Sequence, residues 1–229
     1  MSGDHTHLEV AVGAGASLVL ATQSSTKAYR ARATPRGEAP AVSRLETTVD
    51  VAAHALAVLL PDPFVAFAGA RVEQSVALTL AAGGSCIVWD AITAGRIARG
   101  ESWSFEHLVS RITIDGPDGR LLTENVRLRP DESRAFAARG LQAFGFLALL
   151  GPRVAPIAAR LLERAARDPA ASESEVFVAH PFARGGLEGA ILRVASAQAS
   201  GLGPRLRAWL AELPELLGDD VLGRRAFLG

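Results

Sequence analysis

The strongest constraint on the fold is a short apolar run that ends in an acid, residues 86–89 followed by Asp90. A run that is apolar at every position is typical of a strand covered on both faces, so the chain must supply a layer on each side of it. Side chains alternate along a strand, and Asp90 therefore points the same way as Cys86 and Val88, toward the interior. An ionised carboxylate there is costly unless it is paired or bound to a metal.

A base and a second acid follow Asp90 at two glycine turns. Arg96 comes directly after Gly95, and Glu101 comes directly after Gly100. One interpretation is a buried ion-pair network of Asp90, Arg96 and Glu101 that stabilises a single packing. The other is a functional site, and the residue types alone do not decide between the two.

The composition favours one domain over residues 1–229, because a chain of 229 residues with 49% hydrophobic content can bury a sizeable core. The 24 Lys and Arg balance the 24 Asp and Glu, so neither nucleic acid nor an anionic membrane is indicated as a partner. The one cysteine, Cys86, excludes an internal disulfide and a cysteine-based zinc site. Its apolar neighbours predict a buried, inert thiol.

The sequence shows no targeting or membrane segment. Its first residues lack the basic region and apolar core of a signal peptide. The most apolar run, residues 140–150, is too short to span a bilayer. We therefore expect a cytoplasmic protein.

Hydrophobic alternation predicts a mainly β fold with helices only near the end. Residues 4–30 are expected to form a hairpin whose even positions face inward on both strands. Further strands are expected at residues 45–51, 56–60, 64–70 and 72–80, and in a second hairpin at residues 108–114 and 120–129. In the last third, helical spacing predicts helices at residues 152–168 and 204–217, the second strained or broken at Pro214, with short strands at residues 174–179 and 187–195.

Strand phase places three acids on apolar faces, each on a different strand. Asp4 and the hydroxyl of Thr26 belong to the inward set of the first hairpin, and Glu124 lies on the apolar side of the strand at residues 120–129. A β-bulge or register slip is the alternative for Glu124, and it would expose this acid. Together with Asp90, three inward acids suggest a polar channel or a metal path.

Two sequence motifs include Asp90 and Thr26. The first comprises Trp89-Asp90, Gly95-Arg96 and Gly100-Glu101, with an aromatic residue, Trp103, two positions after the glutamate. The second is TQSSTKAY at residues 22–29, which contains Lys27 and Tyr29. Both resemble segments of the UreD (also called UreH) family of urease accessory proteins, which carries W-D, G-R and G-E at this spacing and T-Q-x-x-T-K-x-Y. Lys27, Tyr29, Arg96 and Glu101 are the supporting residues of these motifs.

The resemblance runs from Ser2 to residues 224–227, RRAF, and is densest up to Glu124. Residues 2–4, Ser-Gly-Asp, match the end of a glycine-rich G-G-D element of the family, with Ser2 in place of its first glycine. Family members usually carry several strands before that element. We therefore expect either a start placed too late or a shortened form whose N-terminal strands are missing before residue 2.

The resemblance implies a β-rich, partly β-helical fold with two α-helices in the C-terminal third. It implies a maturation chaperone, not an enzyme, that bridges apo-urease and the complex of UreF with the GTPase UreG. Nickel would pass to the urease active site through an internal polar tunnel, and the positions that match its lining are Asp4, Thr26, Asp90 and Glu124. Of these, Asp4, Asp90 and Glu124 would contact nickel in transit, with no cofactor permanently bound.

The residue chemistry agrees with such a conduit. Carboxylate and hydroxyl oxygens hold Ni²⁺ more weakly than thiolates or clustered imidazoles, and a conduit must release what it binds. No phosphate-binding loop occurs in the sequence, so GTP hydrolysis is expected of the partner and not of this chain.

Two other functions fit parts of the sequence. A metal-dependent hydrolase could use the cluster of Asp4, His5 and His7, although the histidines lie opposite the apolar face and near the chain terminus. A purely structural β-scaffold would need Asp90 paired with Arg96, and Glu124 paired with another base.

Overall fold

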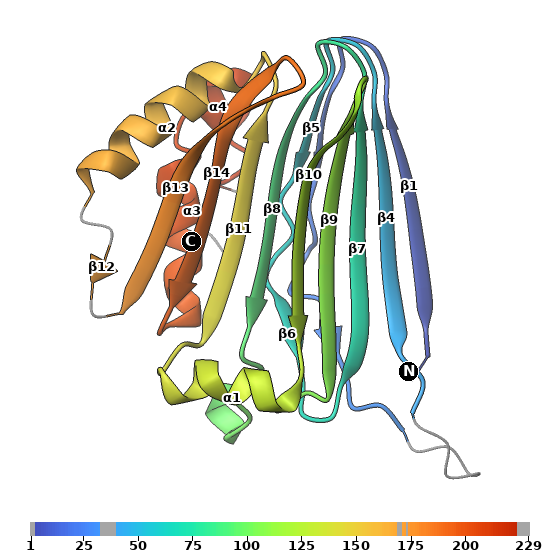
Figure 1. Cartoon of the computed structure of the whole chain (residues 1–229), viewed down its shortest axis with the longest axis vertical. Coiled ribbons are helices and arrows are strands. Elements are labelled where there is room, and N and C mark those ends of the chain that lie inside the picture. Colours follow the sequence, from blue (N-terminus) through green and yellow to red (C-terminus); the bar gives the residue numbers. More distant parts are fainter. Residues whose placement is uncertain (1–2, 33–39, 169–170, 173, 224–229) are drawn as a thin grey trace.

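The computed structural model describes residues 3–32, 40–168, 171–172 and 174–223, which form two stacked β-sheets with helices along one side (Figure 1). Sheet A has the strand order β1-β4-β7-β9-β10. Its strands are β1 (His5–Val12), β4 (Ser43–Val51), β7 (Arg71–Leu80), β9 (His107–Gly116) and β10 (Gly119–Leu128).

Sheet B has the strand order β12-β13-β14-β11-β8-β5-β2, and β6 joins it by pairing with β8 and with β3. Its strands are β2 (Ser17–Leu20), β3 (Lys27–Ala28), β5 (Leu56–Leu59), β6 (Phe64–Ala66), β8 (Ser85–Thr93), β11 (Ala143–Leu150), β12 (Ala171–Ser172), β13 (Glu175–Arg184) and β14 (Leu187–Ser196).

The first half of the chain winds between the two sheets in successive parallel coils. Strands β1, β4, β7 and β9 pair in parallel in sheet A, and β2, β5 and β8 pair in parallel in sheet B. Each of the first three strands of sheet A is followed along the chain by a strand of sheet B, which is the winding of a β-helix. The β-rich, partly β-helical fold expected for the chain is therefore confirmed.

The expected hairpin at residues 4–30 is wrong. Strands β1 and β2 lie in different sheets, and each pairs with the strand one coil later, β4 and β5. The turn at residues 13–16 carries the chain across to the other sheet and does not fold it back on the same one. Strand β6 is also shorter than the expected strand at residues 64–70. The hairpin of β9 and β10, in contrast, forms as expected.

Four α-helices occur among the described residues: α1 (Pro130–Ala138), α2 (Ala155–Arg167), α3 (Leu202–Trp209) and α4 (Leu213–Leu217). The two expected near the C-terminus are present, and the second is divided into α3 and α4, with Pro214 in the first turn of α4. Helix α1 was not predicted, and it lies across one end of the sheets (Figure 1). No helix in the described residues is long and apolar enough to cross a membrane.

Strand β8 is covered on both faces, as its sequence predicts. Ile87 and Trp89 pack toward α2 and α3, and Cys86 and Val88 pack toward sheet A. Burial raises the pKa of the Cys86 thiol to about 12, so the thiol is protonated and inert at neutral pH.

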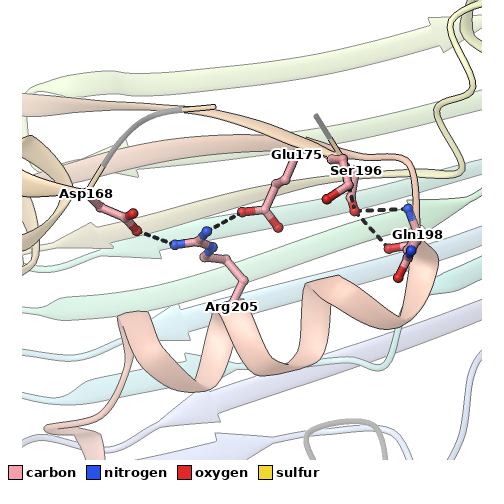
Figure 2. A network of polar contacts seen from close by, with 6 residues as sticks. Asp168, Glu175, Ser196, Gln198 and Arg205 are labelled. Atoms are coloured by element: carbon pink, nitrogen blue, oxygen red, sulfur yellow. Dashed lines mark hydrogen bonds and ion pairs between the residues drawn. The ribbon is translucent and has the colours of Figure 1, made fainter. Parts of the chain in front are cut away.

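An ion-pair network fastens the helices to sheet B (Figure 2). Arg205 on α3 contacts Asp168 after α2 at 2.5 Å and Glu175 on β13 at 2.6 Å. Its guanidinium also lies 5.1 Å from the ring centre of Phe177. Beside it, Ser196 Oγ donates to the carbonyl oxygen of Gln198 at 2.8 Å. The Arg205 contacts join three elements that are separate in sequence, and they link the helices to sheet B.

Candidate passage between the sheets

Asp90 lies between the two sheets, on the face of β8 that turns toward sheet A. Gln74 and Ser110, register partners on β7 and β9, face it from sheet A. Gln74 Nε2 donates to Asp90 Oδ1 at 2.9 Å and to Oδ2 at 3.2 Å, and Ser110 Oγ donates to Oδ2 at 2.7 Å. Gln74 Nε2 also lies 2.8 Å from Ser110 Oγ. The carboxylate is therefore held by neutral donors.

This environment raises the pKa of Asp90. Burial is the largest cause, and the negative charge of Glu124 adds to it, while the hydrogen bonds from Ser110 and Gln74 partly offset the rise. Arg96, the partner that an ion-pair network would require, bonds to Glu101 instead. The interpretation of Asp90, Arg96 and Glu101 as one network is therefore wrong.

Asp90 lines two cavities. The first, which we call the Glu124 cavity, has a volume of about 340 Å³, and its lining includes Asp90, Ser110, Glu124, Phe146 and Arg193. The second, the Thr26 cavity, has a volume of about 330 Å³, and its lining includes Thr6, Thr22, Thr26, Gln74 and Asp90. Because Asp90 lines both cavities, the part of its side chain that remains accessible faces these cavities.

Glu124 lies on the inner face of β10 with its side chain 16% exposed. The register shift in this strand falls between Arg120 and Leu122, and it does not turn Glu124 outward. Arg193 on β14 donates from Nε to Glu124 Oε1 at 3.0 Å, and from its terminal nitrogen to Oε2. This bidentate pair joins sheet A to sheet B.

Phe146 and Arg193 continue the row that begins with Asp90. Asp90 on β8 is the register partner of Phe146 on β11, which is the register partner of Arg193 on β14. The guanidinium of Arg193 lies 5.5 Å from the ring centre of Phe146. Asp90 and the Glu124–Arg193 pair therefore line the same cavity, with Phe146 between Asp90 and Arg193 in the row.

Of the four residues matched to a tunnel lining, the structure brings three to these cavities. Thr26 is half-buried and lines the Thr26 cavity with Asp90, and Glu124 lines the other cavity. Asp4, in contrast, is exposed just before β1, so its expected inward position is wrong. Within the described ranges, no group of three His, Cys, Asp or Glu side chains is placed to hold a metal ion. Asp4, Asp90 and Glu124 thus do not form one metal centre.

Sequence reasoning missed Gln74, Ser110 and Arg193. Gln74 shares its strand face with Val72 and Leu78, and Ser110 shares its face with Leu108 and Ile112. Strand phase places both of them on inner faces, as it does Asp90, although neither carries a charge.

The histidines of the hydrolase alternative lie on the outer face of sheet A. His5 Nε2 is 3.0 Å from Glu46 Oε2, and His7 Nε2 is 3.0 Å from Glu9 Oε1. The hydrogen bond to Glu9, more than the contact with Glu46, raises the pKa of His7. Asp4 is exposed and no metal-holding group of three is found in the described part of the chain, so the geometric basis for this alternative is lost.

The supporting motif residues form a separate cluster beside β3 and β6. Arg96 Nε donates to Glu101 Oε2 at 3.0 Å, and the backbone N–H of Ala68 donates to the same oxygen at 3.1 Å. These two bonds, in that order of effect, lower the pKa of Glu101. Arg96 lies 4.4 Å from the ring centre of Phe67, which also contacts Tyr29. Lys27 is exposed on β3.

Comparison with known proteins gives one consistent match. The sequence model of the UreD urease accessory protein family matches residues 1–228. The chain is 38% identical to urease accessory protein UreD of Sorangium cellulosum and 41% identical to that of an Anaeromyxobacter strain, each over 98% of this chain and over 69% and 73% of those proteins. It is 30% identical to urease accessory protein D of Arabidopsis thaliana over 71% of this chain and 54% of the plant protein. The ends of the resemblance, Ser2 and residues 224–227, lie outside the described residues.

Proposed function

The chain belongs to the UreD family of urease accessory proteins, and from that premise we propose that it conducts nickel to apo-urease through the space between its two sheets. The observation that carries the proposal is that one half-buried carboxylate, Asp90, lines two cavities. Nickel is the cargo of this passage and not a resident cofactor. In this proposal the chain catalyses no reaction of its own.

The lining of the passage supports transient binding. Apart from the guanidinium of Arg193, which is paired with Glu124, its polar side chains are hydroxyls, an amide and carboxylates. The oxygens of these groups hold Ni²⁺ weakly enough for release. No Lys or Arg nitrogen lies within salt-bridge distance of Asp90 among the described residues, so its carboxylate carries no internal counter-ion. A divalent cation that enters the space would supply one and would favour the ionised form.

The partners that complete the proposal are apo-urease on one side and UreF on the other, with UreG bound through UreF. This complex would work in the cytoplasm, and GTP hydrolysis would belong to UreG. The support for association is family membership, since an accessory role in urease maturation requires contact with urease and with other accessory proteins.

A purely structural role is the second candidate, because one observation favours it. Glu124 is paired with Arg193, as a scaffold requires of an inward acid. The other requirement, pairing of Asp90 with Arg96, is not met. A purely structural role therefore accounts for the inward position of Glu124, which has a counter-charge, but not for that of Asp90, which has none in the described part of the chain.

The test is complementation in a strain that carries the urease operon matched to this chain, with its own UreD gene deleted. We expect the chain to restore nickel-dependent urease activity and to co-purify with UreF. A soluble protein that captures UreF but restores no activity would contradict the conduit, whereas loss of both would contradict the complex as well. The empty vector is the control.

A further inference from the structure

Four residues that take no part in the passage gather at one surface. Tyr29 and Arg30 follow β3, Phe67 follows β6, and Arg96 lies in the loop after β8. We call the surface formed by Tyr29, Arg30, Phe67 and Arg96 the Tyr29 patch. It lies outside both cavities that Asp90 lines.

Hydrogen bonds to Glu101 and ring contacts with Phe67 fix the side chains of the patch. Glu101 accepts hydrogen bonds from Arg96 and from the backbone N–H of Ala68, which fixes the guanidinium over the ring of Phe67 at 4.4 Å. Tyr29 meets the same ring edge-on, with ring centres 5.1 Å apart and planes at 81°. Side chains ordered before binding lose little entropy when a partner arrives.

Arg30 lies flat against Gly69. A Cβ atom at Gly69 would stand 3.1 Å from Arg30 Cγ and 3.3 Å from Nε, and the positive φ of 73° at this glycine also disfavours a side chain. An isolated bridge between Arg30 and Ala70 holds the backbone at this point. The Arg30 guanidinium lies close enough to contribute to the lowered pKa of Glu101.

The exposure of these groups is unusual for their types. Tyr29 is the one tyrosine of the chain, and it is 66% exposed although its ring packs on Phe67. The Arg96 side chain is 37% exposed. Tyrosine and arginine on a preformed platform are the residue types that dominate binding energy at protein interfaces.

The charge of the patch selects the chemistry of its partner. Arg30 in the patch, Lys27 two residues before Tyr29, and Arg99 three residues after Arg96 are all exposed. None of the three has a carboxylate within salt-bridge distance in the ranges that the structure describes. The one carboxylate in the cluster, Glu101, is already bonded to Arg96. This positive surplus is local, because the whole chain has zero net charge, which favours a protein segment over nucleic acid.

We propose that the Tyr29 patch is a docking surface for an acidic segment of a protein partner. The partner's carboxylates would pair with Arg30 and Arg96 while an apolar side chain covers the Tyr29 ring. The proposal is independent of nickel conduction, because no patch residue lines the passage.

The test replaces Tyr29 with photo-reactive p-benzoylphenylalanine in the full-length chain, in cells that carry the matched urease operon. The same amino acid at Arg111, exposed on the outer face of sheet A, is the control position. We expect irradiation to join the Tyr29 position to one protein, at a peptide of net negative charge identified by mass spectrometry. Adding Arg30→Glu should lower the yield about tenfold, because it reverses the attraction.

Three results would overturn the proposal. The first is a set of cross-links no more specific than those from position 111. The second is cross-linking to nucleic acid, or to a neutral or basic peptide. The third is a cross-link yield that Arg30→Glu leaves unchanged. Arg30 and Tyr29 are exposed, so the variants are expected to fold, and a circular dichroism spectrum equal to that of wild type verifies this. Since the readout does not depend on urease activity, failure of nickel conduction would leave the cross-link intact.

Discussion

Two regions of the space between the sheets differ although the same strands build both. On β7, Leu78 is buried in a dry core and Gln74, four residues earlier, reaches Asp90. On β9, Ile114 is buried in that core and Ser110, again four residues earlier, reaches the same carboxylate. Two residues before Gln74 and Ser110, Val72 and Leu108 are buried in another apolar cluster. We call the region around Leu78 and Ile114 the dry half, and the region around Gln74 and Ser110 the polar half.

The difference shows that side chains, and not the backbone, decide which half holds cavities. The register is continuous along β7 and β9, where Gln74 pairs with Ser110 and Leu78 pairs with Ile114. A coil of a β-helix repeats its backbone, so a change of inward residue converts packed core into a polar space without changing the fold. Substitutions in the two halves should therefore change stability by different amounts.

The largest effect on stability is expected in the dry half. Leu78→Ala removes a side chain that is 1% exposed, and it should lower the free energy of unfolding by about 2–5 kcal/mol because it leaves a cavity among tightly packed neighbours. Urea denaturation followed by circular dichroism measures this. A loss below about 1 kcal/mol would show that the dry half is not close-packed.

A smaller loss is expected from Ser110→Ala in the polar half. The substitution removes the 2.7 Å donor to Asp90, and it should cost about 1–3 kcal/mol at neutral pH because the half-buried carboxylate loses a hydrogen bond. The same denaturation series measures it. Equal losses for Ser110→Ala and Leu78→Ala would remove the distinction between the halves.

The loss for Ser110→Ala should depend on pH. Burial raises the pKa of Asp90 in the folded state, so stability declines as the pH rises through that raised value. Removal of the Ser110 donor raises the pKa further. The stability gap to wild type should therefore open as the pH rises above the ordinary carboxyl range, and it should close below it. A gap that widens toward acid would contradict this assignment.

The pair that joins the sheets beside the polar half should contribute less. Arg193→Ala is expected to cost about 1 kcal/mol, because the Arg193 side chain is 46% exposed and water screens its attraction to Glu124. Thermal denaturation compared with Glu124→Gln measures the cost. A loss above about 3 kcal/mol would indicate a fully desolvated ion pair.

The smallest effect is expected outside both halves. Arg111 is exposed on the outer face of sheet A, and Arg111→Ala should change the free energy of unfolding by no more than about 0.5 kcal/mol. Its urea midpoint should match that of wild type. A clear shift would show that the outer face contributes to the stability attributed here to the interior.

The sequence predicts the two halves unevenly, for a physical reason. Alternation along a strand is local, so it places Asp90 and Glu124 on inner faces correctly. Strand pairing is not local: β1 pairs with β4 across the intervening coil, and a pattern of period two says nothing about the partner. The expected hairpin at residues 4–30 failed for that reason.

Asp4 shows a second limit of strand phase. Leu8, in phase with Asp4, is 41% exposed, so the covering layer has already thinned at this end of β1. Phase gives the direction of a side chain but not the extent of the layer that covers it. For Gln74 and Ser110, strand phase does predict an inward side chain. They were missed because an uncharged side chain on an apolar face gives a weaker signal than a carboxylate.

The most direct test of the account compares Asp90→Asn with Asp50→Asn in the complemented urease strain. Asp50 is exposed on the outer face of β4, so it controls for loss of one carboxylate. We expect Asp90→Asn to remain folded while nickel-dependent urease activity falls to the level of the deletion strain, and Asp50→Asn to activate like wild type. Full activation by Asp90→Asn would contradict passage of nickel through the polar half, and unfolding of this variant would favour the scaffold.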